Sequence, residues 1–293
     1  MPSSIAIMSR ADEAVSRVSL WRGENVKVSP LSGGLTNENY LVEANGARYV
    51  VRIPGQSTEL LSIDRANEVH NTRAAAVTGI GPAVLEVIPE RDVMVLEFID
   101  GPTMTAQTLQ SAAMAKRMAA SFRRLHGATR FLQDFNMFRL IEYYLTIVEA
   151  HDFRIPADYR DQLPMVAEIE SAVAVGARPS VPCHNDLLCE NFIDDGSALR
   201  IVDYELSGNN DPCFDLGNTA QEAELDDDLR AVLCEAYFGR PDPQQLARMN
   251  LFALMSDVGR DPGQDLRDRL RLQRVLHRAL DASARGAGIR TAS

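Results

Sequence analysis

The sequence contains little lysine, few cysteines and no long apolar run. Lys27 and Lys116 are its only lysines, so any other cation that binds phosphate has to be arginine, which stays charged and donates in a planar fork. The four cysteines lack CxxC pairing and zinc-like spacing, which favours a reducing, cytoplasmic location. No segment approaches the roughly 20 apolar residues that span a bilayer, and no apolar signal sequence opens the chain. We therefore expect a cytoplasmic protein without a membrane partner.

Basic residues are also in short supply. The chain has 30 Lys and Arg against 41 Asp and Glu, a net charge of −11, which argues against nucleic acid or an anionic membrane surface as the main partner. Its 293 residues suffice for one large domain or for two smaller ones that share a cleft. These observations favour a small-molecule ligand.

The first hundred residues predict a small sheet and one helix. Asn45-Gly46 supplies the positive backbone angles of a tight hairpin turn, and Gly79 is positioned to end the helix. The apolar pattern predicts a helix over 63–78 and strands over 26–31, 40–43, 48–53, 83–88 and 93–98. Turn-forming residues in "IDGPT" then indicate a domain boundary near residue 100.

The remainder, residues 101–293, is mainly helical. Apolar residues recur at helical spacing from Met114 to Leu125, and the segments 138–150 and 165–175 continue the pattern. Within this part, "NFI" and "LRIVDY" predict two short strands on either side of an Asp-Asp-Gly turn. The expected class is therefore α+β.

Three polar residues near that hairpin suit phosphoryl transfer, which needs a positioned hydroxyl, a divalent metal and exclusion of water. In "HNDLLCENF", Asp186 can orient a hydroxyl or accept its proton, and Asn191 offers a neutral oxygen. Asp203, at the end of "IVD", offers the charged oxygen that magnesium prefers. Singly, each could equally be a turn or capping residue. The spacing HxDxxxxN followed by a strand ending in Asp favours a kinase.

The chain resembles the choline/ethanolamine kinase family in "LSGGLTNENY", "YVVRIPG", "CHNDLLCENF" and "IVDYELSGNNDPCFDLGN", over residues 28 to 257. The resemblance implies a bilobal protein-kinase-like fold. Residues 1–100 would form a nucleotide-binding lobe with an antiparallel sheet, and residues 101–293 a helical lobe with the catalytic loop and substrate site. It also implies ATP and Mg²⁺ as cofactors and transfer of the γ-phosphate to the hydroxyl of choline or a related amino alcohol.

The resemblance also implies roles for single residues. Asp186 would be the catalytic base, with Asn191 and Asp203 as metal ligands. Arg52 would stand in for the usual kinase lysine on the phosphates, with Glu68 as its partner; without the downstream motif, both would be read as ordinary exposed residues. This is chemically coherent because a guanidinium can bridge a carboxylate and phosphate oxygens.

Other nucleotide contacts follow from the same resemblance. The phosphate lid would be formed by Ser32, Gly33, Gly34, Thr36 and Asn37, where glycine lets backbone N–H groups approach the anion. Glu97 to Ile99 would offer main-chain groups to adenine, although a plain connection between two domains would look the same. His184 would brace the loop and not act as a base.

For the substrate, the resemblance implies Asp186, Tyr204, Glu205, Asp215 and Glu222. Asp215 could also be a helix N-cap. Where relatives often carry aromatic residues, this chain has leucine at 206 and alanine at 223, so ethanolamine or another amino alcohol stays open beside choline. An aminoglycoside or sugar kinase, and a kinase fold that binds nucleotide without turnover, are the alternatives.

After Val258 the chain is arginine-rich and departs from the family. Five leucines between Leu266 and Leu280 can share one side of an amphipathic helix; a shift of reading frame in the source is the other explanation. The oligomeric state does not follow from the sequence, and a homodimer stays open.

Overall fold

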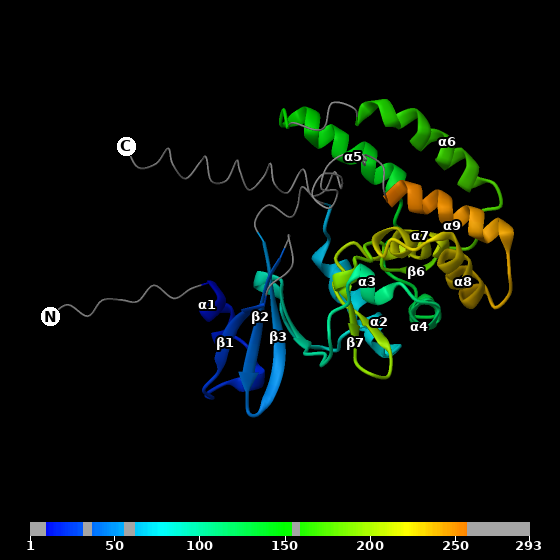
Figure 1. Cartoon of the computed structure of the whole chain (residues 1–293). Coiled ribbons are helices and arrows are strands. Elements are labelled where there is room, and N and C mark those ends of the chain that lie inside the picture. The colour runs from blue at the N-terminus through cyan, green and yellow to red at the C-terminus, as the bar shows by residue number, and fades with distance from the viewer. Residues whose placement is uncertain (1–9, 32–36, 56–61, 154–158, 257–293) are drawn as a thin grey trace.

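A computed structural model describes residues 10–31, 37–55, 62–153 and 159–256. The N-terminal part contains a five-stranded antiparallel sheet in the order β1-β2-β3-β5-β4. Its strands are β1 (Lys27–Leu31), β2 (Asn37–Ala44), β3 (Ala47–Pro54), β4 (Val84–Ile88) and β5 (Val93–Glu97). All five predicted strands are present, and Figure 1 shows the sheet at the left of the molecule.

The hairpin between β2 and β3 turns where the sequence predicts. Asn45 and Gly46 have φ angles of 53° and 75°, and Ala44 pairs with Ala47 across them, as a two-residue turn with positive φ requires. β2 begins at Asn37 instead of residue 40, because its pairing with β3 continues to Pro54. The strand therefore reaches the edge of the phosphate-lid segment.

The predicted helix 63–78 is α2 (Arg65–Val77). Asp64 caps it: one carboxylate oxygen accepts the backbone N–H groups of Ala66 and Asn67 at 2.9 and 3.0 Å. A short helix, α1 (Arg10–Ser16), precedes the sheet. The helix that carries Glu68 is thus fixed at its start by its own sequence.

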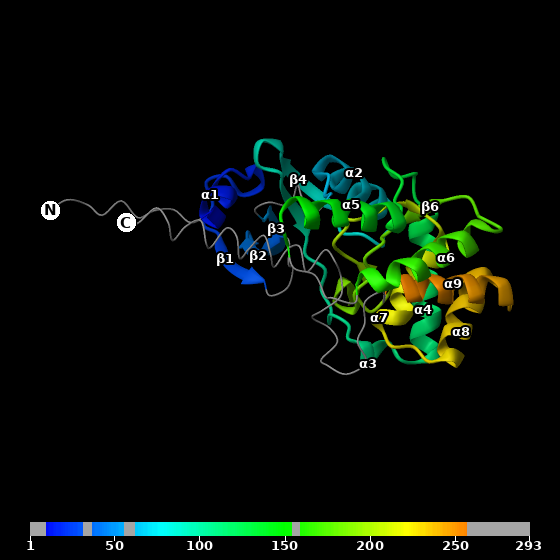
Figure 2. The ribbon, with the colours of Figure 1, turned by 90° about the horizontal axis from the view of Figure 1, so that it is seen from above.

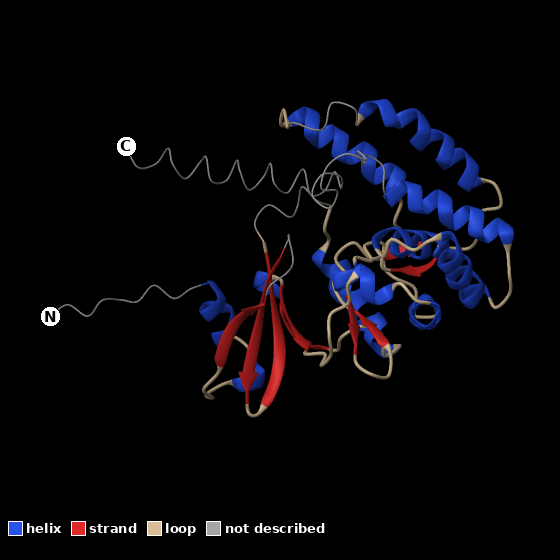
Figure 3. Cartoon of the chain, viewed as in Figure 1, coloured by secondary structure: helices blue, strands red, loops and turns tan. Residues whose placement is uncertain are grey.

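The C-terminal part is mainly helical, as expected, and Figure 3 shows this by colour. The predicted helices appear as α4, α5 and α6, while α7 to α9 have no separate sequence prediction. The helices are α3 (Ala106–Leu109), α4 (Ala112–His126), α5 (Met137–Ala150), α6 (Leu163–Ala174), α7 (Pro212–Glu222), α8 (Asp227–Phe238) and α9 (Pro243–Ser256). The amphipathic helix expected after residue 258 lies outside the described residues.

Two small antiparallel sheets lie among these helices. The predicted hairpin is β7 (Phe192–Asp194) and β8 (Leu199–Ile201). A second pair, β6 (Val181–Cys183) and β9 (Gly208–Asn210), joins segments distant in sequence. Together the two pairs hold the ends of residues 184–191, which we call the HND loop, and of residues 202–207.

Each lobe has its own hydrophobic core, and Figures 1 and 2 show the two lobes side by side. Trp21 and Val51 belong to the core of the sheet lobe (residues 10–97), and the Trp21 ring N–H donates to a backbone carbonyl at 2.9 Å. Phe122 and Phe214 belong to the core of the helical lobe (residues 106–256), which also takes in Ile80 after α2. The boundary at residue 100 stays a prediction. Among the described residues, no helix has the length and apolarity to cross a membrane.

Candidate active site

His184 attaches the HND loop to the segment that follows β8. The Nε2 of His184 donates to the carbonyl of Val202 at 2.9 Å, and its Nδ1 accepts the backbone N–H of Asp186 at 3.3 Å. The ring also packs edge-on against Tyr204 with 4.9 Å between centroids. Burial lowers the pKa of His184, so the neutral ring donates and accepts at the same time. His184 has the bracing position that the sequence predicts.

Asn191 joins the HND loop to the segment that leads to Asp203. Its backbone carbonyl accepts the N–H of Val202 at 3.0 Å, and its side-chain Nδ2 donates to the carbonyl of Asp186 at 2.8 Å. Only the amide nitrogen can donate, so this bond turns Oδ1 away from that carbonyl and fixes it as an acceptor. The Asp186 residue itself is half-buried.

Asp203 follows β8 with a left-handed backbone, φ 75°, a conformation that aspartate tolerates better than most residues. Its Oδ1 accepts a hydrogen bond from Nη2 of Arg52. Burial alone would raise the pKa of Asp203, but the charge of Arg52 outweighs it and the pKa lies below its ordinary value. The carboxylate is therefore ionised at neutral pH, as a hard oxygen ligand must be.

Arg52 lies at the centre of an ionic cluster, defined as Arg52, Arg65, Glu68, Asp203 and Glu205. The expected ion pair with Glu68 is present at 3.0 Å, and Glu205 lies 3.2 Å away on another side. Burial opposes the charge of Arg52, but the three carboxylates outweigh it and raise its pKa. Arg65 bonds Glu68 at 2.7 Å. The cluster thus holds two cations and three carboxylates.

Asn37 connects the cluster to the sheet lobe. It is buried at the start of β2, and its Nδ2 donates to Glu205 at 2.7 Å. The other residues expected in the phosphate lid, Ser32, Gly33, Gly34 and Thr36, lie outside the described residues. Asn37 therefore links the two lobes, and its role toward phosphate stays a prediction.

The expected adenine segment follows β5. The Glu97 backbone N–H donates to the Ala83 carbonyl at 2.9 Å, and its carboxylate accepts from the Ala83 N–H and from Arg200, both at 3.0 Å. Ile99 is buried beyond the end of the strand. Glu97 thus ties the end of the sheet to β8 of the helical lobe, and the contact with adenine stays a prediction.

Two residues expected to contact substrate lie in the protein interior instead. Asp215 is 0% exposed, and its two oxygens accept the backbone N–H groups of His184 and Asn185, both at 2.8 Å. Tyr204 is 1% exposed. Burial at this depth removes both side chains from substrate, which corrects the sequence prediction. The alternative of an N-cap is also wrong, because Asp211 caps α7 by accepting a backbone N–H at 2.9 Å.

Glu222, another acidic residue of that prediction, is half-buried at the last position of α7. Its backbone carbonyl accepts the thiol of Cys189 in the HND loop at 3.3 Å. The end of α7 is therefore in contact with the loop that carries Asp186. The role of Glu222 toward substrate stays a prediction.

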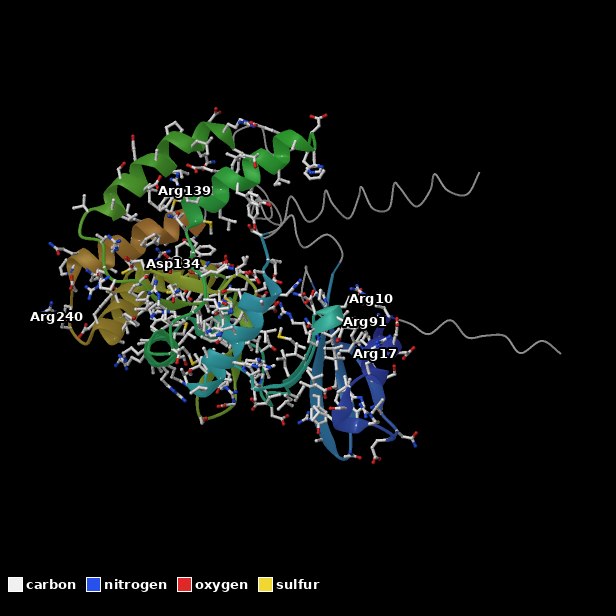
Figure 4. All side chains as sticks on the ribbon, turned by 180° about the vertical axis from the view of Figure 1, so that it is seen from behind. Arg10, Arg17, Arg91, Asp134, Arg139 and Arg240 are labelled. Atoms are coloured by element: carbon white, nitrogen blue, oxygen red, sulfur yellow. The ribbon has the colours of Figure 1, made fainter. Side chains whose placement is uncertain are left out.

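A cavity of about 370 Å³ opens between the lobes, beside the ionic cluster. We call it the interlobe cavity. Glu205 contributes to both the cluster and the cavity wall. The other charged residues of the wall are Asp64, Asp134 and Arg139, the last two labelled in Figure 4. The lining thus holds three carboxylates and one guanidinium, and arginines outside the wall pair with two of the carboxylates: Arg52 with Glu205 and Arg130 with Asp134.

Sequence reasoning missed two residues of this region. Arg65 bonds Glu68 three residues on, and that spacing on the predicted helix was a usable signal. Asn185 has φ 67° and donates through Nδ2 to the carbonyl of Leu206 at 3.1 Å. Asparagine is enriched among residues with positive φ, but nothing in the sequence indicates its carbonyl partner.

Comparison with known proteins agrees with this geometry. Residues 28–234 match the choline/ethanolamine kinase family. The chain is 28% identical to the LicA protein of Haemophilus influenzae over 212 residues, 70% of this chain and 61% of that one. It is also 28% identical to ethanolamine kinase 2 of Mus musculus over 69% of this chain and 54% of that one. It thus spans a little over half the length of these relatives.

A solved structure of the same family resembles the fold over most of the chain. The choline/ethanolamine kinase family protein of Mesorhizobium loti superposes with a TM-score of 0.74 at 32% identity, covering 92% of this chain and 93% of that one. A sheet lobe that carries α2, joined to a helical lobe that carries the HND loop, defines the protein-kinase-like fold. Within that class, the chain belongs to the choline/ethanolamine kinase family.

Proposed function

We propose that the chain is an ATP- and Mg²⁺-dependent kinase that transfers the γ-phosphate to the hydroxyl of choline or ethanolamine. The observation that carries this proposal is the double attachment of Asn191, whose side chain bonds the Asp186 carbonyl and whose backbone bonds Val202. These two hydrogen bonds hold together Asp186 as the candidate base, Asn191 as the candidate amide ligand and the segment that leads to Asp203. Membership of the family supports the substrate class.

In this proposal Asp186 orients the substrate hydroxyl and accepts its proton. The hydroxyl oxygen forms a bond to the γ-phosphorus while the bond to the β,γ-bridging oxygen breaks. His184 keeps the backbone of Asp186 in place and stays neutral, because its two nitrogens already donate and accept. The proton therefore goes to the Asp186 carboxylate and not to the imidazole.

The residues present fit a magnesium ion. Asn191 presents an amide oxygen of fixed direction, and Asp203 presents an ionised carboxylate, which are the hard oxygen ligands that Mg²⁺ takes. The ion, when bound, neutralises charge on the phosphate oxygens. Asp203 would hold it through the oxygen that Arg52 leaves open, since Arg52 bonds Oδ1.

In this proposal Arg52 is the cation that meets the triphosphate. Its side chain is anchored by Glu68 on one side and by Glu205 on another, which fixes the plane of its guanidinium. Neither lysine suits this role, because Lys27 is paired with Glu43 on β1 and Lys116 is exposed on α4. We expect Arg52 to orient phosphate oxygens while Glu68 keeps it in place.

We place the amino group of the substrate in the interlobe cavity, whose wall carries three carboxylates. Its volume of about 370 Å³ suits a small amino alcohol. Leu206 lines the wall next to Glu205, and the aromatic residues Phe135 and Tyr143 line it as well. An ammonium group that donates hydrogen bonds suits such carboxylates, and a quaternary ammonium needs aromatic faces. The wall offers carboxylates for the first and aromatic residues for the second, so we keep both substrates.

The test measures ATP consumption with choline, ethanolamine, an aminoglycoside and a sugar. Asp186→Asn should lower kcat by roughly 10²- to 10⁴-fold, the usual contribution of a general base, with an unchanged melting temperature. Glu190→Gln, an exposed acid of the same loop, is the matched control and should retain activity. Retained turnover in Asp186→Asn, or turnover confined to the aminoglycoside or sugar, contradicts the proposal.

A further inference from the structure

A chain of buried polar groups runs from α8 to the HND loop. The hydroxyl of Tyr237 in α8 lies 2.7 Å from Nδ1 of His126, the last residue of α4. Nε2 of His126 lies 3.1 Å from Oδ2 of Asp215 in α7. Asp215 in turn accepts the backbone N–H groups of His184 and Asn185. Three helices thus meet behind the two residues that precede Asp186.

The chemistry of these groups fixes the direction of the hydrogen bonds. A carboxylate only accepts, so Nε2 of His126 carries the hydrogen and donates to Asp215. When the ring is neutral, Nδ1 accepts and the Tyr237 hydroxyl is its donor. Burial first, and the nearby Cys183 and Asp215, raise the pKa of Tyr237, which keeps the phenol protonated. Tyr237 therefore selects the His126 tautomer that can bond Asp215.

Packing holds the ring in this orientation as well. The His126 ring stacks on Phe122 with 6.0 Å between centroids and 10° between planes, and Tyr237 meets it edge-on at 5.3 Å. His126 is 7% exposed and Asp215 0%. In such surroundings a polar group without a hydrogen-bond partner is costly. Removing one side chain of the series Tyr237, His126 and Asp215 should therefore weaken the hydrogen bonds of the next.

A metal ion is the competing explanation for this cluster, because His126, Cys183 and Asp215 place ligand atoms within 4.8 Å of one another. Hydrogen bonds already use these atoms: the Cys183 thiol donates to the carbonyl of Asn210 at 3.6 Å. Burial also raises the pKa of Cys183, which disfavours the thiolate that a metal needs. The cluster is therefore a hydrogen-bonded one.

We propose that His126 and Tyr237 are positioning residues for phosphoryl transfer, acting through Asp215 on the backbone just before Asp186. Neither residue touches substrate or nucleotide in this scheme. Their effect is on the direction of the Asp186 carboxylate, and a small displacement of a reacting group can cost on the order of 10²-fold in rate. The proposal rests on the function proposed above, in which Asp186 is the base.

The experiment compares kcat, KM for ATP and melting temperature for four variants of the full chain. His126→Phe, which removes both bonds, should lower kcat by about 10²-fold. Tyr237→Phe, which removes one hydroxyl, should lower it by roughly 3- to 10-fold. His126→Gln keeps a donor where Nε2 lies and should recover most of the loss. Phe238→Leu, beside Tyr237 in α8 and 4.8 Å from its ring, is the control for simple loss of packing.

If His126 and Tyr237 only stabilise the fold, kcat should fall in proportion to the loss of melting temperature. Tyr237→Phe and Phe238→Leu would then show the same relation between kcat and melting temperature. That result overturns the proposal, as does full activity in His126→Phe. A second measurement, amide hydrogen exchange at His184 and Asn185, needs no turnover. Their exchange should quicken about tenfold in His126→Phe and not in His126→Gln. If the wild-type chain phosphorylates none of the alcohols, the proposed function fails, while exchange still tests the link from His126 to the loop.

Discussion

Replacing Arg52 by methionine is the sharpest test of the ionic cluster. Methionine keeps the unbranched stem and removes the guanidinium that Asp203, Glu68 and Glu205 share. The side chains of Arg52, Glu68 and Glu205 are 6%, 1% and 6% exposed. Three carboxylates then remain with Arg65 as the one cation of the cluster, and water cannot replace the lost partner.

Breaking a buried ion pair by removing one partner costs about 3–5 kcal/mol. For a chain of this size, each kcal/mol lowers the melting temperature by roughly 2–4 °C, so Arg52→Met should melt roughly 6–20 °C below the wild type. Arg48→Met is the matched control on the same strand. Arg48 is 44% exposed and pairs with the 73% exposed Asp100, so its loss should cost less than about 1 kcal/mol.

The assay is thermal unfolding of the two variants and of the double variant Arg52→Met, Glu68→Gln without added ligand. The double variant should regain part of the stability, because it removes one of the stranded carboxylates. Mg²⁺ should stabilise Arg52→Met more than wild type, since Asp203 loses its competing partner. Equal melting temperatures for Arg52→Met and Arg48→Met would refute the view that the cluster depends on Arg52.

Other predictions follow from burial. Because burial lowers the pKa of His184 below 6.5, the unfolded chain binds more protons and stability should fall as the pH drops below 6.5; His184→Gln should flatten that fall in melting curves between pH 7.5 and 5.5. Gly217→Ala places a methyl group 2.4 Å from the carbonyl oxygen of Met249 and should cost about 1–3 kcal/mol in denaturant unfolding, with α7 and α9 forced apart. Trp21, the only tryptophan, lies in the sheet-lobe core, so its fluorescence should report unfolding of that lobe while helical circular dichroism reports the other.

The parts of the fold that could be predicted are those with a sequence signal confined to neighbouring residues. The Asn45-Gly46 turn and the alternating strands on either side fix the hairpin of the sheet. The pair β6 and β9 escapes prediction because each strand has three residues and their partners are far apart in sequence. Alternation cannot be read over so short a span, and the equally short β7 and β8 could be predicted only because an Asp-Asp-Gly turn joins them.

The candidate site also has a part that the sequence predicts and a part that it does not. The spacing of Asp186, Asn191 and Asp203 carries a chemical requirement, so it is visible in one sequence. Asp215 and Glu205 are both acids of the same motif, and the sequence offers no means to tell which one faces the ligand. The structure separates the two: Asp215 is enclosed beneath the HND loop, while Glu205 lines the interlobe cavity, where we propose that substrate binds. Burial comes from packing of helices and cannot be read from residue type.

The proposed role of Arg52 as the cation beside the triphosphate has a practical consequence for chemical profiling. Reagents that tag kinases with acyl derivatives of ATP depend on a nucleophilic amine beside the triphosphate, and a guanidinium stays protonated and does not react. The two lysines of this chain offer no substitute, because Lys27 pairs with Glu43 on the outer strand and Lys116 projects from the exposed face of α4. A survey that detects nucleotide-binding proteins through labelled lysines would therefore miss this protein at any cellular abundance.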